Sequence, residues 1–91
     1  MGPLLSWGRA QGVEILYLKL SILGEKGYPD RMILWPDNNI IFVEWKQPGE
    51  QPRKLQLARH ETLRAMGFDV RVYDDRNVAL EEIKSTISAT L

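Results

Sequence analysis

Two acids and one lysine stand at the ends of apolar segments, where charged side chains are costly to bury. Asp30 follows a proline in GYPDR, and Glu44 is separated from Lys46 by one tryptophan in FVEWK. Burying an unpaired charge is strongly unfavourable, so a small domain is not expected to carry these charges without a use for them. Converging carboxylates favour Mg²⁺ or Mn²⁺, and a lysine beside them supplies positive charge for a phosphate or an attacking water.

These side chains can act together only if the strands point them to one face. Alternation along a strand puts Glu44 and Lys46 on one face and Trp45 on the other. A hairpin would bring Asp30 alongside them. A four-residue turn in that hairpin would pair Asp30 with Trp45 and aim its side chain at the wrong face. We therefore expect a one-residue change in register or a bend induced by Pro29.

The segments around these residues predict the order α-β-β-β-α-β-α. The expected elements are a helix at 4–11, strands at 13–20, 32–35 and 40–46, a helix from 53 to a C-cap at Gly67, a strand at 68–73 and a helix at about 77–88. Turn residues at 36–39 join the hairpin strands, and the helix before the last strand makes that pairing parallel. Residues 24–27 are expected to form a mobile loop. The prediction is an α/β fold in which helices flank a central mixed sheet.

Composition excludes several classes of protein. The chain has 91 residues, no cysteine, one histidine (His60) and a net charge of zero. It therefore has no disulfide framework or zinc site of its own, and it is not a generic basic nucleic-acid binder. The first 23 residues contain charges that argue against a signal peptide or a membrane span. We expect one cytoplasmic domain, in a bacterial or phage-infected host cell.

A basic segment has two possible interpretations. Arg53, Lys54, Arg59 and Arg64 fall close together in the helix predicted after residue 53. Such a cluster is more often a solvated helix face than a phosphate-binding face. His60 lies one turn after Gln56 on the same face of this helix, and it is expected to be a satisfied surface histidine rather than a catalytic one.

The linked set of motifs resembles the virus-type replication-repair nuclease (VRR-NUC) domain, a branch of the PD-(D/E)XK nuclease superfamily. The set consists of GYPDR, FVEWK and Gln56 in a helix that ends in LRAMGFDV. Each motif alone is common by chance, but together they are specific, and the resemblance spans about residues 12–84. It implies a PD-(D/E)XK restriction-endonuclease-like fold and one VRR-NUC nuclease domain over residues 1–91.

The resemblance also implies an activity, which is metal-dependent hydrolysis of a DNA phosphodiester. Asp30 and Glu44 would be ligands of Mg²⁺ or Mn²⁺, and the Trp45 backbone carbonyl is a possible third ligand. Lys46 would act at the attacking water, and Gln56 would hold water or phosphate. These roles agree with the chemistry of the residues themselves.

One departure from the family concerns a further ligand. Members often add a glutamate from a helix near the N-terminus, and here no acid precedes Glu14. Either Glu14 substitutes for it, or the site has two carboxylates and relies on waters and the substrate. The residues expected to contact DNA are Lys19, Lys26, Arg53, Lys54 and Arg59.

The resemblance favours an endonuclease for branched DNA, and specifically a homodimeric Holliday junction resolvase. Two alternatives remain, a non-catalytic DNA-binding or assembly module of the same fold and a restriction-type nuclease that cuts linear duplex. Apolar residues at both ends of the chain are expected to need a partner subunit, unless they fold onto the core of their own chain: Leu4, Leu5, Trp7, Ile87 and Leu91. Trp35 and Trp45 are expected to be packing residues rather than base-stacking platforms.

Overall fold

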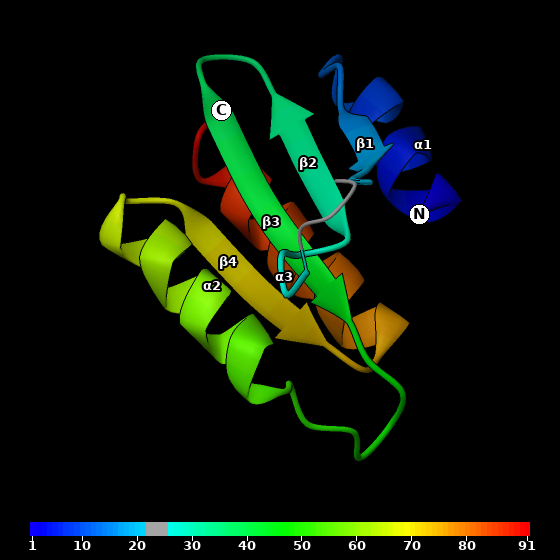
Figure 1. Ribbon diagram of the computed structural model, residues 1–91. Coiled ribbons are helices and arrows are strands. Elements are labelled where there is room, and N and C mark those ends of the chain that lie inside the picture. The colour runs from blue at the N-terminus through cyan, green and yellow to red at the C-terminus, as the bar shows by residue number, and fades with distance from the viewer. Residues whose placement is uncertain (22–25) are drawn as a thin grey trace.

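The computed structural model describes residues 1–21 and 26–91. The elements follow the predicted order, with bounds α1 Gly2–Ala10, β1 Leu16–Lys19, β2 Arg31–Trp35, β3 Asn39–Trp45, α2 Lys54–Ala65, β4 Asp69–Tyr73 and α3 Arg76–Ser88. The strands form one mixed sheet in the order β1-β2-β3-β4 (Figure 1). β1, β2 and β3 pair antiparallel, whereas β3 and β4 pair parallel. The predicted α/β fold with helices around a mixed sheet is confirmed.

The hydrophobic core lies on the face of the sheet that α1 and α3 cover. Fully buried core side chains come from both helices and the two central strands: Leu4, Ile33, Ile41, Val43, Ile83 and Ile87. Figure 1 shows α3 behind the sheet and α2 in front of β4. No helix in the described ranges is long and apolar enough to cross a membrane.

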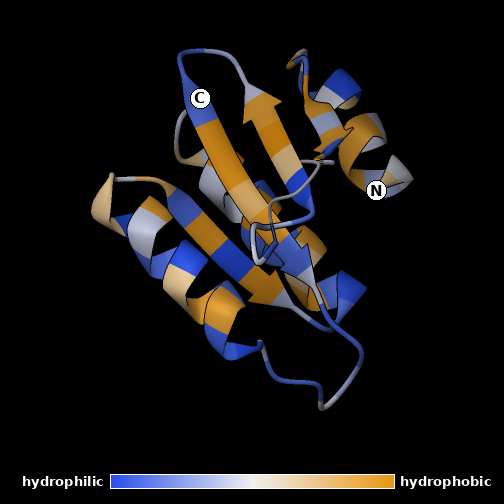
Figure 2. Ribbon diagram, in the orientation of Figure 1, coloured by the Kyte–Doolittle hydropathy of each residue, from blue (hydrophilic) through white to orange (hydrophobic). Residues whose placement is uncertain are grey.

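The opposite face of the sheet is apolar but partly open. Leu16 and Leu18 pair with Leu34 and Met32, so strand alternation turns them away from the core. They remain 44% and 39% exposed. Figure 2 shows hydrophobic residues along β2 and β3, and α2 lies over β4. The sheet therefore has one closed face and one partly open face.

The β2–β3 turn sets the register of the candidate site. Asp37 and Asn38 have φ angles of 73° and 63°, which Asp and Asn tolerate better than most residues. The turn has three residues rather than four, because Trp35 already pairs with Asn39. The same register, continued one residue before β2, places Asp30 opposite Glu44. The one-residue change in register is confirmed.

β1 is shorter than predicted because the residues before it cap α1. Gly12 has a φ of 72°, and the N–H of Val13 donates to the carbonyl of Gly8 at 2.8 Å. This geometry is typical of a helix that ends in a left-handed residue. The strand begins only at Leu16. α1 begins earlier than expected, since Pro3 suits the first turn of a helix.

The terminal apolar residues belong mostly to the core. Leu4 and Ile87 are fully buried, and Leu5 and Trp7 pack against the core while partly buried. Leu91 is 65% exposed. The expectation that a small domain leaves these residues open is wrong for all but Leu91, because α1 packs against α3.

Candidate active site

Asp30 and Glu44 lie next to each other on the α2 face of the sheet. The carbonyl of Asp30 accepts hydrogen bonds from the N–H of Leu20 and from Arg31 Nη1, both at 2.9 Å. Arg31 pairs with Val43, so Asp30 is opposite Glu44. Side chains opposite each other in an antiparallel pair have Cβ atoms about 4.5–5.5 Å apart. The strands therefore bring the two predicted ligands together.

The GYPD segment is held against α2. A Cβ atom on Gly27 would lie 2.8 Å from Cγ and 2.9 Å from O of Leu55, and the φ of Gly27 is 85°. Only glycine permits this approach and this angle without strain. Arg59 lies over the Tyr28 ring at 5.0 Å from its centroid, and Arg59 Nε donates to the Lys26 carbonyl at 3.3 Å. Gly27 belongs to a loop, as predicted, and this part of the loop packs against α2, while residues 24 and 25 lie outside the described residues.

Glu44 is buried at 6% exposure, in a position that disfavours its charge. Burial raises the pKa of its carboxyl, and the negative charge of Asp30 raises that pKa further, while Lys46 opposes both. Asp30 Oδ1 and Glu44 Oε1 are buried without a hydrogen-bond partner within the described ranges. Unpartnered buried carboxylate oxygens destabilise a fold. The pair is therefore suited to receive positive charge from outside the chain.

Lys46 is fixed beside this pair. Its Nζ lies 3.8 Å from Glu44 Oε2 and donates to Gln56 Oε1 at 2.8 Å, and 9% of its side chain is exposed. Gln56 Oε1 also accepts from the Arg53 backbone N–H at 2.9 Å, which satisfies a free donor at the start of α2. Gln56 was expected to hold water or phosphate. Its carbonyl oxygen instead holds the lysine and caps the helix.

Two further candidates do not join this group. Glu14 precedes β1 at the end of that strand away from Asp30, whose carbonyl contacts Leu20. The steps from residue 14 to residue 20 span about 20 Å when extended. Lys19 pairs with Arg31 at the correct end, but alternation points its side chain to the α1 and α3 face. The described residues contain no group of three His, Cys, Asp or Glu side chains that could hold a metal.

The tryptophans have the packing roles predicted for them. Trp45 turns its ring toward the core, and its Nε1 donates to the Tyr17 hydroxyl at 2.7 Å. Trp35 is 7% exposed, and its Nε1 donates to Thr90 Oγ1 at 2.9 Å. Both indoles are therefore part of the core side of the sheet.

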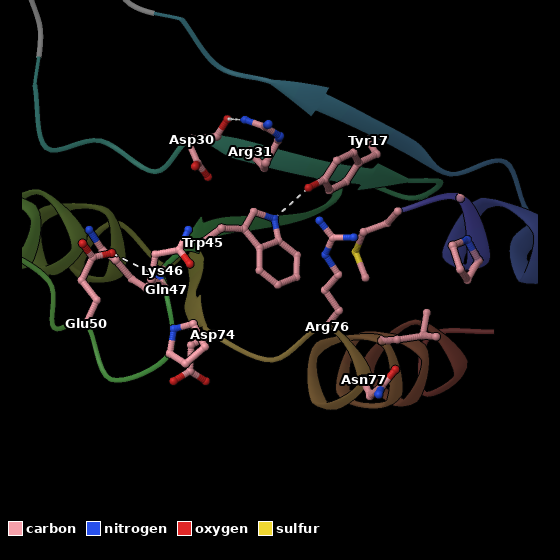
Figure 3. A pocket seen from close by; sticks show the side chains of 15 residues that line it. Tyr17, Asp30, Arg31, Trp45, Lys46, Gln47, Glu50, Asp74, Arg76 and Asn77 are labelled. Atoms are coloured by element: carbon pink, nitrogen blue, oxygen red, sulfur yellow. Dashed lines mark hydrogen bonds between the residues drawn. The ribbon is translucent and has the colours of Figure 1, made fainter.

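A cavity of about 690 Å³ adjoins the site at the end of the sheet. Its walls include Asp30 and Lys46, and also Arg31, Trp45 and Arg76. Figure 3 shows these side chains, which come from the segment before β2, from β2, from the end of β3 and from the start of α3. The volume is in the range of small-ligand sites. Arg76 had no signal in the sequence, because only the fold brings α3 to this edge.

The basic segment of α2 contains cations of two kinds. Arg53 and Lys54 are exposed at the start of the helix. Arg59 contacts the GYPD segment, and Arg64 Nη2 donates to a carbonyl of β4 at 2.8 Å. Lys26 is exposed next to the same segment. The cluster is thus neither one solvated face nor one phosphate-binding face, because two of its arginines hold the fold together.

His60 is fully buried, and the expectation of a surface histidine is wrong. Neither of its ring nitrogens has a hydrogen-bond partner in the part of the chain that the structure describes. Burial lowers the pKa of the imidazole, and the charges of Arg64 and Lys46 lower it further. A sequence signal existed, since His60 lies one turn after Gln56 on the same helix face.

Comparison with known proteins points to the same class as the motifs. No family model matches the sequence. Over 56 residues, 62% of the chain, the sequence is 45% identical to "Putative nuclease p44" of Acyrthosiphon pisum secondary endosymbiont phage 1, and the match spans 60% of that protein. A solved structure described as a VRR_NUC domain matches with a TM-score of 0.71 and 29% identity, over 92% of each chain.

Proposed function

We propose that the chain, which is similar to a VRR_NUC domain and to a putative phage nuclease, is a metal-dependent, structure-specific DNA endonuclease of the VRR-NUC type. Residues 1–91 would act as one domain, with Asp30, Glu44, Lys46 and Gln56 as its catalytic set. One observation carries the proposal: the buried carboxylate of Glu44 and the partly buried carboxylate of Asp30 each have a buried oxygen without a partner among the described residues, beside a lysine that Gln56 holds. Unpartnered carboxylate oxygens of this kind destabilise the folded state, which favours a functional reason for their presence.

The donors of this site fit Mg²⁺ or Mn²⁺. Mg²⁺ is usually bound through one or two carboxylates and keeps several waters. Asp30 and Glu44 would supply the carboxylates, and the Trp45 backbone carbonyl a third oxygen. Glu14 lies too far along β1 to contribute, so waters and the substrate would complete the shell. When bound, the ion would supply an acidic water and positive charge at the phosphoryl oxygen.

The remaining residues would orient the reaction. Lys46 would place its ammonium group at the attacking water and next to the developing negative charge on the phosphate. Its burial limits solvent screening and strengthens this effect. Gln56 would keep the ammonium group in place through the 2.8 Å hydrogen bond. Loss of either side chain should slow the chemical step more than it weakens binding of DNA.

Contacts with DNA outside the site would go mainly to phosphates. Arg53, Lys54 and Lys26 are exposed on the α2 side of the molecule, near the site. Charge of this kind binds the backbone without reading sequence. Arg59 would act indirectly, by holding the GYPD segment, and Lys19 would reach DNA only at the sheet edge.

The substrate would be branched DNA, specifically a four-way junction, and the working unit a homodimer. Each chain supplies one catalytic set, whereas symmetric resolution of a junction takes two cuts, so a two-fold pair of subunits is the simplest arrangement. The phage source of the sequence relative supports action in the cytoplasm of a bacterial or phage-infected cell. Resolution of junctions in DNA repair would be the corresponding role.

The partly open sheet face supports the dimer better than the terminal residues do. Leu4 and Ile87 are buried in the core, whereas Leu16 and Leu18 present apolar surface away from it. Contiguous apolar surface of this kind often marks a protein contact. Light scattering at micromolar concentration tests this proposal, and Leu18→Glu should yield a monomer. A wild-type monomer at this concentration would contradict the dimer.

Cleavage assays on three substrates test the proposed activity. Linear, flapped and four-way DNA of the same sequence are incubated with Mg²⁺, Mn²⁺, Ca²⁺ or EDTA. We expect cleavage of the junction with Mg²⁺ and Mn²⁺, binding alone with Ca²⁺, which takes more ligands at longer distances, and no cleavage in EDTA. Equal cleavage of linear duplex would indicate a restriction-type nuclease. Binding without cleavage under all conditions would indicate a DNA-binding module.

A further inference from the structure

His60 lies on the face of α2 that is turned into the protein, and its side chain is buried. It is the buried residue of that helix, where an apolar side chain would be the ordinary choice. A neutral imidazole has one donor and one acceptor nitrogen, and neither has a protein partner among residues 1–21 and 26–91. Leaving both unpaired costs folding free energy. The imidazole must therefore be retained for something other than stability.

Two cations from different elements act electrostatically on the imidazole. Lys46 comes from the end of β3, and Arg64 comes from the next turn of α2. Both charges act with burial to lower the pKa of His60, so the ring is neutral at neutral pH. A neutral ring can present its unprotonated nitrogen to a cation as an acceptor.

The ammonium group of Lys46 has a donor to spare. It carries three N–H bonds. One donates to Gln56 Oε1 at 2.8 Å, and Glu44 Oε2 lies 3.8 Å from Nζ. Gln56 and His60 are one turn apart on the same face of α2, so the helix can contact the lysine at two successive turns.

We infer that His60 is a positioning residue for Lys46, which accepts a hydrogen bond from the ammonium group through one internal water. Buried waters commonly join polar groups that lack protein partners. The inference rests on the proposed function, where Lys46 acts at the attacking water. Gln56 would fix one N–H of the lysine and His60 a second, which leaves the ammonium group one orientation toward the reacting phosphate.

The alternative hypothesis, that His60 has only a structural role, predicts different results. If the ring served only to fill space, a leucine of similar size would serve as well or better. His60→Leu removes both unpartnered nitrogens, whereas His60→Gln keeps one donor and one acceptor. Leu63→Met is the matched control, because it alters packing on the same helix without changing a polar group.

Stability and single-turnover cleavage are measured for the four proteins. His60→Leu should raise the melting temperature by about 4 °C. It should also slow cleavage of saturating DNA about 10- to 100-fold, the scale of a small misplacement of a reacting group. Binding of DNA in Ca²⁺ should not change. His60→Gln should restore most of the rate, and Leu63→Met should cleave like the wild type. Wild-type cleavage by His60→Leu, or equal losses in both His60 variants, would overturn the inference.

A second measurement does not depend on cleavage. The ammonium group of Lys46, held at two points, should give a slowly exchanging ¹H–¹⁵N signal in the wild type and in His60→Gln. The signal should be lost by exchange in His60→Leu. If the wild type cleaves no DNA but shows this pattern, the proposed function fails and the role of His60 in holding Lys46 stands. If wild type and His60→Leu show the same exchange, the role of His60 fails whatever the activity.

Discussion

The two faces of the sheet differ in how completely their polar side chains are paired. On the α1 and α3 face, Arg71 Nη2 donates to Asp69 Oδ2 at 2.8 Å and to Thr86 Oγ1 at 2.7 Å, and the Tyr73 hydroxyl donates to Glu82 at 3.1 Å. On the α2 face Lys46 donates to Gln56, but neighbouring carboxylate and imidazole atoms are unpaired in the described part of the chain. Within the described ranges, every buried side-chain polar atom without a partner belongs to Asp30, Glu44 or His60.

This difference separates residues that stabilise the fold from the residues of the candidate site. The closed face buries the apolar core and satisfies its hydrogen bonds, so it provides most of the folding free energy. The α2 face carries charges and donors that lack partners and therefore lowers that free energy. Functional sites are commonly maintained at such a cost. Substitutions on the two faces should consequently affect different measurements.

The largest expected effect is loss of cleavage when the α2 face is neutralised. Asp30→Asn, Glu44→Gln and Lys46→Ala should each lower the single-turnover rate by about 10³-fold or more, the scale of losing a group at the reacting centre. The variants should stay folded by circular dichroism and bind DNA in Ca²⁺. Glu82→Gln makes the same chemical change as Glu44→Gln on the closed face and should cleave normally. Near wild-type cleavage by any of the three would refute the site assignment.

A core truncation on the closed face should show the reverse behaviour. Ile83 is fully buried, and Ile83→Ala should cost about 2–5 kcal/mol of unfolding free energy. Its cleavage rate per folded molecule should stay within about twofold of the wild type, because the site lies across the sheet. Urea denaturation measures the first quantity. Leu57→Ala, at a position 46% exposed on α2, is the control and should cost less than about 1 kcal/mol. Equal costs at the two positions would contradict a core confined to the closed face.

Glu44→Gln should stabilise the metal-free protein in a pH-dependent way. The pKa of Glu44 is raised in the fold, chiefly by burial, so the folded state resists its ionisation. Below the ordinary pKa of glutamate both states are protonated, and the variant should match the wild type. As pH rises through the raised pKa, the wild type loses stability. At neutral pH the free energy of unfolding of the variant should therefore exceed that of the wild type by about 1 kcal/mol. Urea denaturation in EDTA measures this difference, and exposed Glu61→Gln should show none. A variant less stable than the wild type at neutral pH would contradict the sign.

Local patterns predicted most of the fold and the centre of the site. Two apolar runs joined by turn residues located β2 and β3, and the requirement that Asp30 share a face with Glu44 predicted either the register shift or a bend at Pro29. These features depend on neighbouring residues and on one hairpin. The same motifs identified Lys46 and Gln56 as site residues, but the hydrogen bond between them was not predicted.

Features that depend on tertiary packing were predicted poorly. Burial of His60 follows from which face of α2 meets the sheet, and helical spacing alone does not decide that. The close approach of Gly27 to α2 and the arrival of Arg76 at the cavity join segments distant in sequence. Leu4 was expected to be open because the packing of α1 on α3 has no local signature. In each case the missing information was a contact between elements.

The smallest expected effect concerns charges on the outside of α2. Arg53→Ala with Lys54→Ala should weaken Ca²⁺-supported DNA binding severalfold and lower the slope of log Kd against log salt by about one to two, since each lost phosphate contact releases roughly 0.9 fewer counterions. All sequences should be affected alike, because phosphate contacts carry no base information. Arg9→Ala with Lys84→Ala removes the same charge from α1 and α3 and should leave the slope unchanged. If this control flattened the slope equally, DNA would respond to net charge rather than to the α2 face. If the α2 variant instead changed sequence preference, these side chains would be reading bases.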